Sequence, residues 1–237
     1  MAAAKIGRGV KITFLGHSAF KLSGAGVNVL IDPWLSNPAF QTPVEQVGPV
    51  DLILVTHGHA DHVGETVAVA QKTGASVVAI HELSVILNRQ GAPAVIGMNK
   101  GGTTPVAGCK VTMTQAVHSS AVDEGGELIA AGDPGGFVIE FPNGFVAYHA
   151  GDTAVFKDME LIRELYHPEL AMLPIGSHYV MSPAEAALAC RMLKPRWVIP
   201  MHYGTFPVLT GTPAELIELL KGENITVIPL KPGESVA

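Results

Sequence analysis

Hydrophobic residues occur in short runs separated by glycine and proline, a pattern typical of many strands joined by tight turns. The run at 52–56 is almost entirely apolar, which predicts a strand covered on both faces. Further strands are predicted at 11–14, 27–31, 75–80, 110–116, 136–141, 145–149, 170–173, 197–200 and 225–228. Apolar residues at helical spacing predict helices from His62 to Gly74 and at 82–90, 156–166, 183–193 and 213–221.

Turn and capping residues fall between these elements. Ser182, followed by Pro183 and Glu185, predicts a capping box at the start of the helix over 183–193. Pro142-Asn143-Gly144 predicts a hairpin turn, and 101–105 has the glycine and proline content of a connector. Because no linker or change in composition divides the 237 residues, we predict one α/β domain over 1–237 that contains two sheets.

Composition narrows the class of protein. Hydrophobic residues make up 48% and charged residues 15%, which excludes a disordered chain. No window approaches the roughly 18 apolar residues of a membrane span. Cys109 and Cys190 lie far apart and outside any C-x-x-C pair, so a disulfide framework is not expected. Residues 1–8 hold no apolar stretch of signal-peptide length, and together these features predict a cytoplasmic protein.

The candidate chemistry is concentrated where the apolar strand ends. Four ligand-type residues, His57, His59, Asp61 and His62, fall within six positions there and open the next helix. His57 and His59 are two apart, so in an extended loop they point the same way. Asp61 and His62 fall at the helix start and point in a different direction. Two directions of presentation favour two adjacent metal ions over one.

Three more ligand-type residues follow the ends of other predicted strands, namely His118, Asp152 and His202. Taken singly, each is as consistent with an incidental polar residue as with a ligand. Their shared placement favours ligands, because sheets of α/β proteins bind ligands at strand ends. Imidazole and carboxylate groups bind zinc, and also manganese or iron. We therefore expect two divalent metal ions, with zinc as the first candidate.

These motifs, in this order, resemble those of the metallo-β-lactamase superfamily. The resemblance rests on His57-x-His59-x-Asp61-His62, His118, Gly151-Asp152-Thr153, His202 and the Asp32 of Ile31-Asp32-Pro33-Trp34. The runs at 16–18, 148–153 and 200–203 are further similar to a branch of uncharacterised metal-dependent hydrolases near the ascorbate-6-phosphate lactonases. The resemblance covers about residues 11–230 and implies an αββα sandwich with the metals at one edge.

The resemblance also implies a role for each residue. One metal would be held by His57, His59 and His118, the other by Asp61, His62 and His202, with Asp152 bridging them. Asp32 would stand behind the ligands and orient their imidazoles. Two divalent ions about 3.5–4 Å apart can share a hydroxide that attacks a carbonyl or phosphoryl centre, and the metals stabilise the oxyanion.

Three other histidines have open roles. His149 is a candidate catalytic residue, together with Asp61, because it could donate a proton to the leaving group. It could instead orient Asp152, or be a core histidine bonded to the backbone. His17 is a candidate for substrate contact or for support of a ligand. His178 could line the pocket or belong to an ordinary loop.

We expect a metal-dependent hydrolase that acts on a small, anionic ester, lactone or phosphodiester. The second hypothesis is a nuclease or phosphodiesterase acting on nucleic acid, against which the net charge of −6 argues. The third is a non-catalytic metal-binding protein, against which the ligand set argues, because structural zinc sites are closed four-ligand cages. The expected partner is a small molecule, with no nucleic acid and no membrane, and the apolar fraction leaves room for a homo-oligomer.

Overall fold

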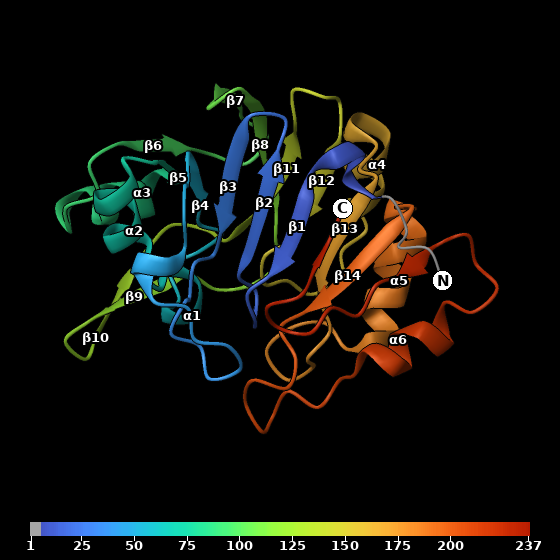
Figure 1. The fold of residues 1–237 in the computed structure, drawn as a ribbon. Coiled ribbons are helices and arrows are strands. Elements are labelled where there is room, and N and C mark those ends of the chain that lie inside the picture. The colour runs from blue at the N-terminus through green and yellow to red at the C-terminus, as the bar shows by residue number, and fades with distance from the viewer. Residues whose placement is uncertain (1–5) are drawn as a thin grey trace.

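The computed structural model describes residues 6–237, which form two facing β-sheets between two layers of helices (Figure 1). The first sheet has the strand order β16-β1-β2-β3-β4-β5-β6 and the second β15-β14-β13-β12-β11-β8-β7. This single-domain αββα sandwich is the predicted fold. Residues 1–5, part of the segment in which we searched for a signal peptide, lie outside the described residues.

Each sheet is antiparallel on one side and parallel on the other. The first contains β1 (Lys11–Phe14), β2 (Phe20–Gly24), β3 (Val27–Ile31), β4 (Leu52–Leu54), β5 (Ser76–Ile80), β6 (Val95–Met98) and β16 (Ser235–Val236). The second contains β7 (Thr103–Val106), β8 (Cys109–Gln115), β11 (Gly135–Glu140), β12 (Val146–His149), β13 (Leu170–Pro174), β14 (Trp197–Met201) and β15 (Thr226–Val227). The pairings make β1, β3 and β4 run in one direction, and likewise β8, β12 and β14.

Side-chain alternation along the second sheet divides its residues between two cores. Phe137 and Ile139 of β11 face the first sheet, whereas Val138 faces the helices. Ala147 and Tyr148 of β12 divide in the same way. Because successive side chains of a strand point to opposite faces, a strand covered on both sides carries apolar residues at consecutive positions, as residues 137–139 of β11 do.

The helices cover the outer faces of the sheets. They are α1 (Ala60–Val63), α2 (Thr66–Thr73), α3 (His81–Arg89), α4 (Met159–Tyr166), α5 (Pro183–Leu193) and α6 (Pro213–Leu219). α2 and α3 contact the first sheet, and α4, α5 and α6 pack on the second (Figure 1). The capping box predicted at Ser182 is present, and Thr212 forms a second one with Glu215. Among the helices of residues 6–237, none combines the length and the apolar character that crossing a membrane requires.

The helix predicted from His62 to Gly74 is wrong in one respect, because Gly64 divides it into α1 and α2. Gly64 has φ 42°, and a Cβ at this position would lie 2.4 Å from the carbonyl oxygen of Pro33. The close approach requires glycine, because any side chain would push the two segments apart. The single turn of α1 is therefore held against the loop that follows β3.

Several strands escaped prediction. The supposed connector at 101–105 contains most of β7, which lies at the edge of its sheet. Its Pro105 is tolerated there, because an edge strand can do without one N–H donor. β2 and the separate hairpin of β9 (Ala121–Glu124) and β10 (Glu127–Ala130) were also missed. The hairpin is mostly exposed and acidic residues interrupt its apolar ones, so it lacks the continuous apolar run of the buried strands.

Candidate metal centre

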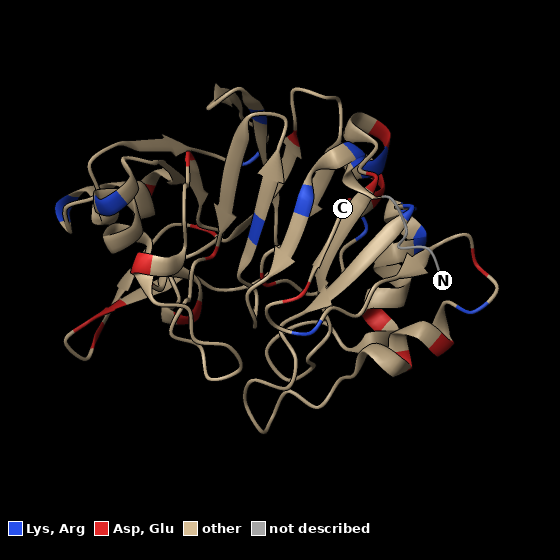
Figure 2. Ribbon diagram, viewed as in Figure 1, with Lys and Arg blue, Asp and Glu red and all other residues tan. Residues whose placement is uncertain are grey.

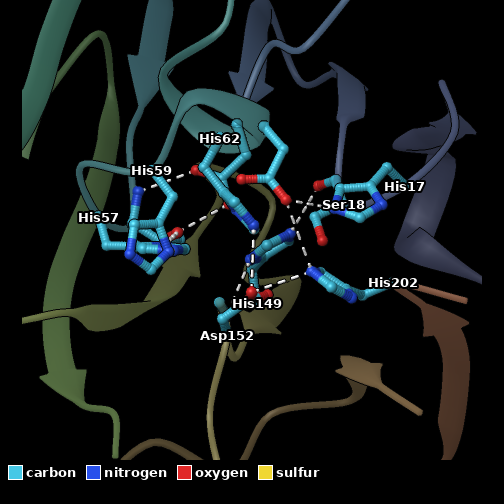
Figure 3. A network of polar contacts seen from close by, with 12 residues as sticks. His17, Ser18, His57, His59, His62, His149, Asp152 and His202 are labelled. Carbon is cyan, nitrogen blue, oxygen red and sulfur yellow. Dashed lines mark hydrogen bonds and ion pairs between the residues drawn. The ribbon is translucent and has the colours of Figure 1, made fainter. Parts of the chain in front are cut away.

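The ligand-type side chains converge at one edge of the sandwich, although they come from both sheets (Figure 3). β1 leads to His17, β3 to Asp32 and β4 to the loop that carries His57 and His59. From the second sheet, β8, β12 and β14 lead to His118, Asp152 and His202. Because these strands run in matching directions within each sheet, their carboxyl ends gather at the same edge.

The residues form two groups that could each hold a cation. His57, His59 and His118 each place a ring nitrogen within 4.8 Å of the others. Asp61, His62 and His202 form the second group, which also contains His17. In the first group, Nε2 of His57 lies 2.9 Å from Nδ1 of His59.

Asp152 lies between the two groups. Its Oδ2 is 3.3 Å from Nε2 of His62, 3.0 Å from Nε2 of His202 and 3.7 Å from Nε2 of His118. It is 2% exposed, so these imidazoles replace the water that a carboxylate ordinarily binds. One carboxylate thus contacts members of both groups.

Asp32 sets the protonation of two of the imidazoles from behind. Its carboxylate accepts hydrogen bonds from Nδ1 of His62 and from the hydroxyl of Thr56, both at 2.8 Å. Because that hydroxyl donates to Asp32, it can only accept from Nδ1 of His57, 3.0 Å away. His57 and His62 therefore each carry a proton on Nδ1 and direct Nε2 inward, the arrangement that metal-binding histidines require.

Buried polar atoms without partners indicate that the site is built for a cation. Among residues 6–237, Nε2 of His62 and Oδ1 of Asp152 are buried and form no hydrogen bond. Such atoms are rare in folded proteins because desolvation costs free energy that only a partner restores. A metal ion between lone pairs of this kind would supply the partner, so the donor set fits the group.

The pKa shifts agree with this interpretation. Burial lowers the pKa of His57, His59 and His118 below the ordinary value, which keeps these rings neutral, as metal ligands must be. Burial would also lower the pKa of His62, but the carboxylates of Asp152 and Asp32 outweigh it and raise the pKa well above its usual range. In the metal-free protein, these carboxylates thus hold a proton where a cation would bind.

The carboxylates are ionised despite their burial. Burial would raise the pKa of Asp152, but His62 and His202 outweigh it and hold the pKa well below its usual range. Burial acts in the same direction on Asp61, and its hydrogen bond from His17 reverses the effect and lowers the pKa. Both residues therefore offer negative charge to a cation.

His17 lies deeper in the site than a residue at the pocket surface would. It is 1% exposed, and its Nε2 is 3.0 Å from Oδ2 of Asp61. Its Nδ1 lies 3.0 Å from the hydroxyl of Thr205, and its ring centroid is 3.9 Å from that of His202. Of the two roles considered for His17, this position supports the second, in which it supports Asp61.

His149 and His178 do not reach the pocket. Nδ1 of His149 accepts from the backbone N–H of Gly151 at 3.2 Å, so its Nε2 carries the proton and donates to the carbonyl of Ser18 at 3.0 Å. With both nitrogens bonded to backbone inside the core, His149 has none to offer a leaving group. His178 is exposed and packs edge-on against Tyr179.

A pocket of about 310 Å³ opens onto the two groups. Its lining includes His59, Asp61, His118, Ser119, Asp152, Tyr179, His202 and Phe206. Tyr179 and Phe206 escaped the sequence analysis, because an aromatic residue in a loop gives no signal that separates a pocket wall from a core position. Thr56 was also missed, although its place directly before His57 was a usable signal.

A four-layer sandwich with histidine and aspartate groups gathered at one edge is the arrangement of the metallo-β-lactamase fold. A family model described as "Beta-lactamase superfamily domain" matches residues 27–203. A UPF0173 metal-dependent hydrolase of Rubrobacter xylanophilus is 52% identical over 233 residues, covering 96% of both chains. That of Methanopyrus kandleri is 49% identical over 230 residues, covering 95% of this chain and 99% of the relative. The chain belongs to this family of metal-dependent hydrolases within the β-lactamase superfamily.

Solved structures agree with the family. Igni18, a metallo hydrolase from Ignicoccus hospitalis, superposes with a TM-score of 0.87 at 40% identity, covering 96% of this chain and 97% of that one. An isothiocyanate hydrolase from Delia radicum gut bacteria superposes with a TM-score of 0.76 at 22% identity, covering 96% of this chain and 98% of that one. The second likeness concerns the fold alone.

Proposed function

We propose that this hydrolase uses two divalent metal ions, held by the two groups and bridged by Asp152, to cleave an ester, lactone or phosphodiester bond of a small molecule. The observation that carries the proposal is the position of Asp152, whose Oδ2 lies within 3.7 Å of imidazoles from both groups. Zinc remains the first candidate, with manganese or iron as alternatives. The cytoplasmic location and a homo-oligomeric state stay predictions from the sequence.

The chain's own residues prepare the site for this reaction. His57, His59 and His118 would hold one ion, and Asp61, His62 and His202 the other. When bound, such ions act as Lewis acids and lower the pKa of water toward about 7. The protein contributes fixed ligand directions, because Asp32 and Thr56 hold their imidazoles before any metal arrives.

The pocket favours catalysis over the non-catalytic hypothesis. A structural metal cage is closed by four protein ligands, whereas ligand residues of both groups here line a pocket open to a substrate. For His149 we propose a supporting role behind Asp152 in place of proton donation, because both of its nitrogens are bonded to backbone. Asp61 is the candidate catalytic residue that remains at the pocket.

The test is Asp152→Ala, with metal content measured by elemental analysis and hydrolysis measured on a panel of lactones, phosphodiesters and thioesters. We expect two metal ions per wild-type chain, one or none in the variant, and loss of all hydrolysis. Asp133→Ala is the control, because Asp133 is an exposed carboxylate paired with Lys100. An Asp152→Ala protein that keeps two metals and full turnover would refute the bridging role.

A further inference from the structure

The pocket wall carries aromatic rings and lacks side-chain cations. Beyond the ligand-type residues, its lining consists of Ser119, Tyr179 and Phe206, and no lysine or arginine of residues 6–237 contributes to it. Figure 2 shows basic positions on strands β1 and β2 and around the helices. Proteins that recognise carboxylate or phosphate commonly place an arginine or lysine against it. This wall offers an anionic substrate no such partner.

Phe206 is held firmly in place at this wall. Its ring stacks on Trp34 with centroids 5.8 Å apart and planes 27° apart, and it meets His17 edge-on at 5.6 Å. His17 is itself held by Asp61 and Thr205. A ring fixed in this way offers a flat apolar surface at small entropic cost, the property that suits aromatic residues to ligand recognition.

Tyr179 adds a second ring at the same pocket. It is 55% exposed, which leaves a large apolar side chain in water when no substrate is bound. Burying such a ring against another apolar group is favourable, whereas burying an anion there without a cationic partner is costly. The two rings therefore favour an apolar substrate group over an anionic one, as the lack of lysine and arginine in the pocket lining also does.

We propose that the substrate is an uncharged ester, thioester or lactone whose aromatic or bulky apolar group packs on Phe206 and Tyr179. This inference rests on the proposed hydrolase function and replaces the anionic substrate expected from the sequence. The ligand groups would receive the bond to be cleaved, and the aromatic wall would select the acyl group beside it.

The experiment compares two esters with the same leaving group on metal-loaded protein. They are 4-nitrophenyl phenylacetate and the anionic mono-4-nitrophenyl fumarate, whose trans carboxylate cannot attack its own ester. Each kcat/KM is divided by the rate of hydrolysis by hydroxide alone, which removes intrinsic reactivity. We expect the phenylacetate to be preferred about tenfold or more, the discrimination that one good apolar contact supplies.

A variant of Phe206 tests whether this ring causes the preference for the phenylacetate. Phe206→Ala should lower kcat/KM for the phenylacetate about tenfold relative to kcat/KM for the fumarate, mainly through KM, while the metal content is retained. Phe40→Ala is the matched control, because Phe40 is a partly exposed phenylalanine outside the pocket lining. A preference for the fumarate, or a Phe206→Ala variant that slows both esters equally, would overturn the inference and leave the hydrolase function standing.

A binding measurement covers the case in which neither ester is cleaved, an outcome that counts against the proposed function. Phenylacetamide and succinamate are titrated into metal-loaded protein by ligand-observed NMR. Tighter binding of phenylacetamide that Phe206→Ala weakens supports the aromatic wall. Equal binding, or tighter binding of succinamate, refutes it.

Discussion

The carboxylate of Asp32 lies 2.8 Å from Nδ1 of His62, a fully buried contact that joins the end of β3 to α1. The same carboxylate reaches His57 through the hydroxyl of Thr56. One residue that lines no part of the pocket thus orients an imidazole in each ligand group. Variants at this position test the metal centre from behind, without removing a proposed ligand.

Asp32→Asn should weaken metal binding by about 10–100-fold, the usual effect of losing a supporting carboxylate. All three hydrogen-bond partners of Asp32 are donors. The NH2 group of the asparagine would replace one of the two accepting oxygens and would face a donor with a donor. Competition with a chromogenic chelator measures the affinity. Asp51→Asn is the control, because Asp51 accepts its hydrogen bonds from Asn28 at the surface. An unchanged affinity in Asp32→Asn would mean that the imidazoles are oriented by other contacts.

Gly151→Ala should destabilise the fold and weaken metal binding. Gly151 has φ 64°, and a Cβ there would lie 2.8 Å from the carbonyl oxygen of Gly135 and 2.9 Å from Cβ of Thr56. Relief of these contacts must displace either the strand end before Asp152 or the residue before His57. Strain and overpacking together should lower the free energy of unfolding by about 2–5 kcal/mol, as measured by urea denaturation.

Gly222→Ala separates steric contact from backbone strain. Gly222 has φ 85°, and a Cβ there meets no atom of the described residues within 4 Å. Its cost should be only the left-handed backbone strain of about 1–2 kcal/mol, with no change in metal content. Equal effects of the two substitutions would show that the close approach at Gly151 is relieved without cost.

His149→Phe should lower the free energy of unfolding by about 3 kcal/mol, because it leaves the Ser18 carbonyl and the Gly151 N–H unpaired in the core. Metal content should persist, because neither ring nitrogen faces the ligands, while turnover falls as the segment before Asp152 loosens. Urea denaturation and elemental analysis measure the two effects. His81→Phe, at an exposed histidine, should change stability by less than about 0.5 kcal/mol. Unchanged stability and full turnover in His149→Phe would contradict the supporting role behind Asp152.

The metal-free protein should lose stability as pH falls from about 6.5 to about 4. Burial, reinforced by His202 and His62, lowers the pKa of His17 from 6.5 to about 4 against the opposing effect of Asp61. Above pH 6.5 this ring is neutral in both states and its contribution is complete. Between the two values the unfolded chain binds a proton that the folded chain refuses, so unfolding gains about 3 kcal/mol.

Urea denaturation of metal-free protein at several pH values measures this loss. His17→Gln should make the profile between pH 6.5 and 4 less steep, because glutamine does not titrate whereas the other buried histidines still do. His178→Gln serves as the control, since His178 is exposed. A His17→Gln profile as steep as that of the wild type would assign the acid sensitivity to other groups.

Local patterns were sufficient to predict most strands and one α/β domain with two sheets, and they marked the candidate ligands. The αββα class came from the resemblance of the motifs to the metallo-β-lactamase superfamily. Strand periodicity and turn residues depend on near neighbours in the chain, so they can be interpreted without coordinates. The run from His57 to His62 is readable for the same reason, because six consecutive positions carry four ligand-type residues. Such patterns fail at Gly64: apolar residues at helical spacing continue past it, although the chain turns there and the helix is divided in two.

The folded chain alone established which way each side chain faces. His17 lies 188 positions from Thr205, yet the two are 3.0 Å apart, because the ends of β1 and β14 meet where the two sheets pack. His149 is the last residue of β12, the strand that leads to Asp152, but its side chain points into the core toward Ser18. Phe206 becomes a pocket wall only because Trp34, from the other sheet's loop, stacks on it. Such contacts depend on how the two sheets pack on each other. The periodicity within one segment carries no information on the distance between residues of different sheets.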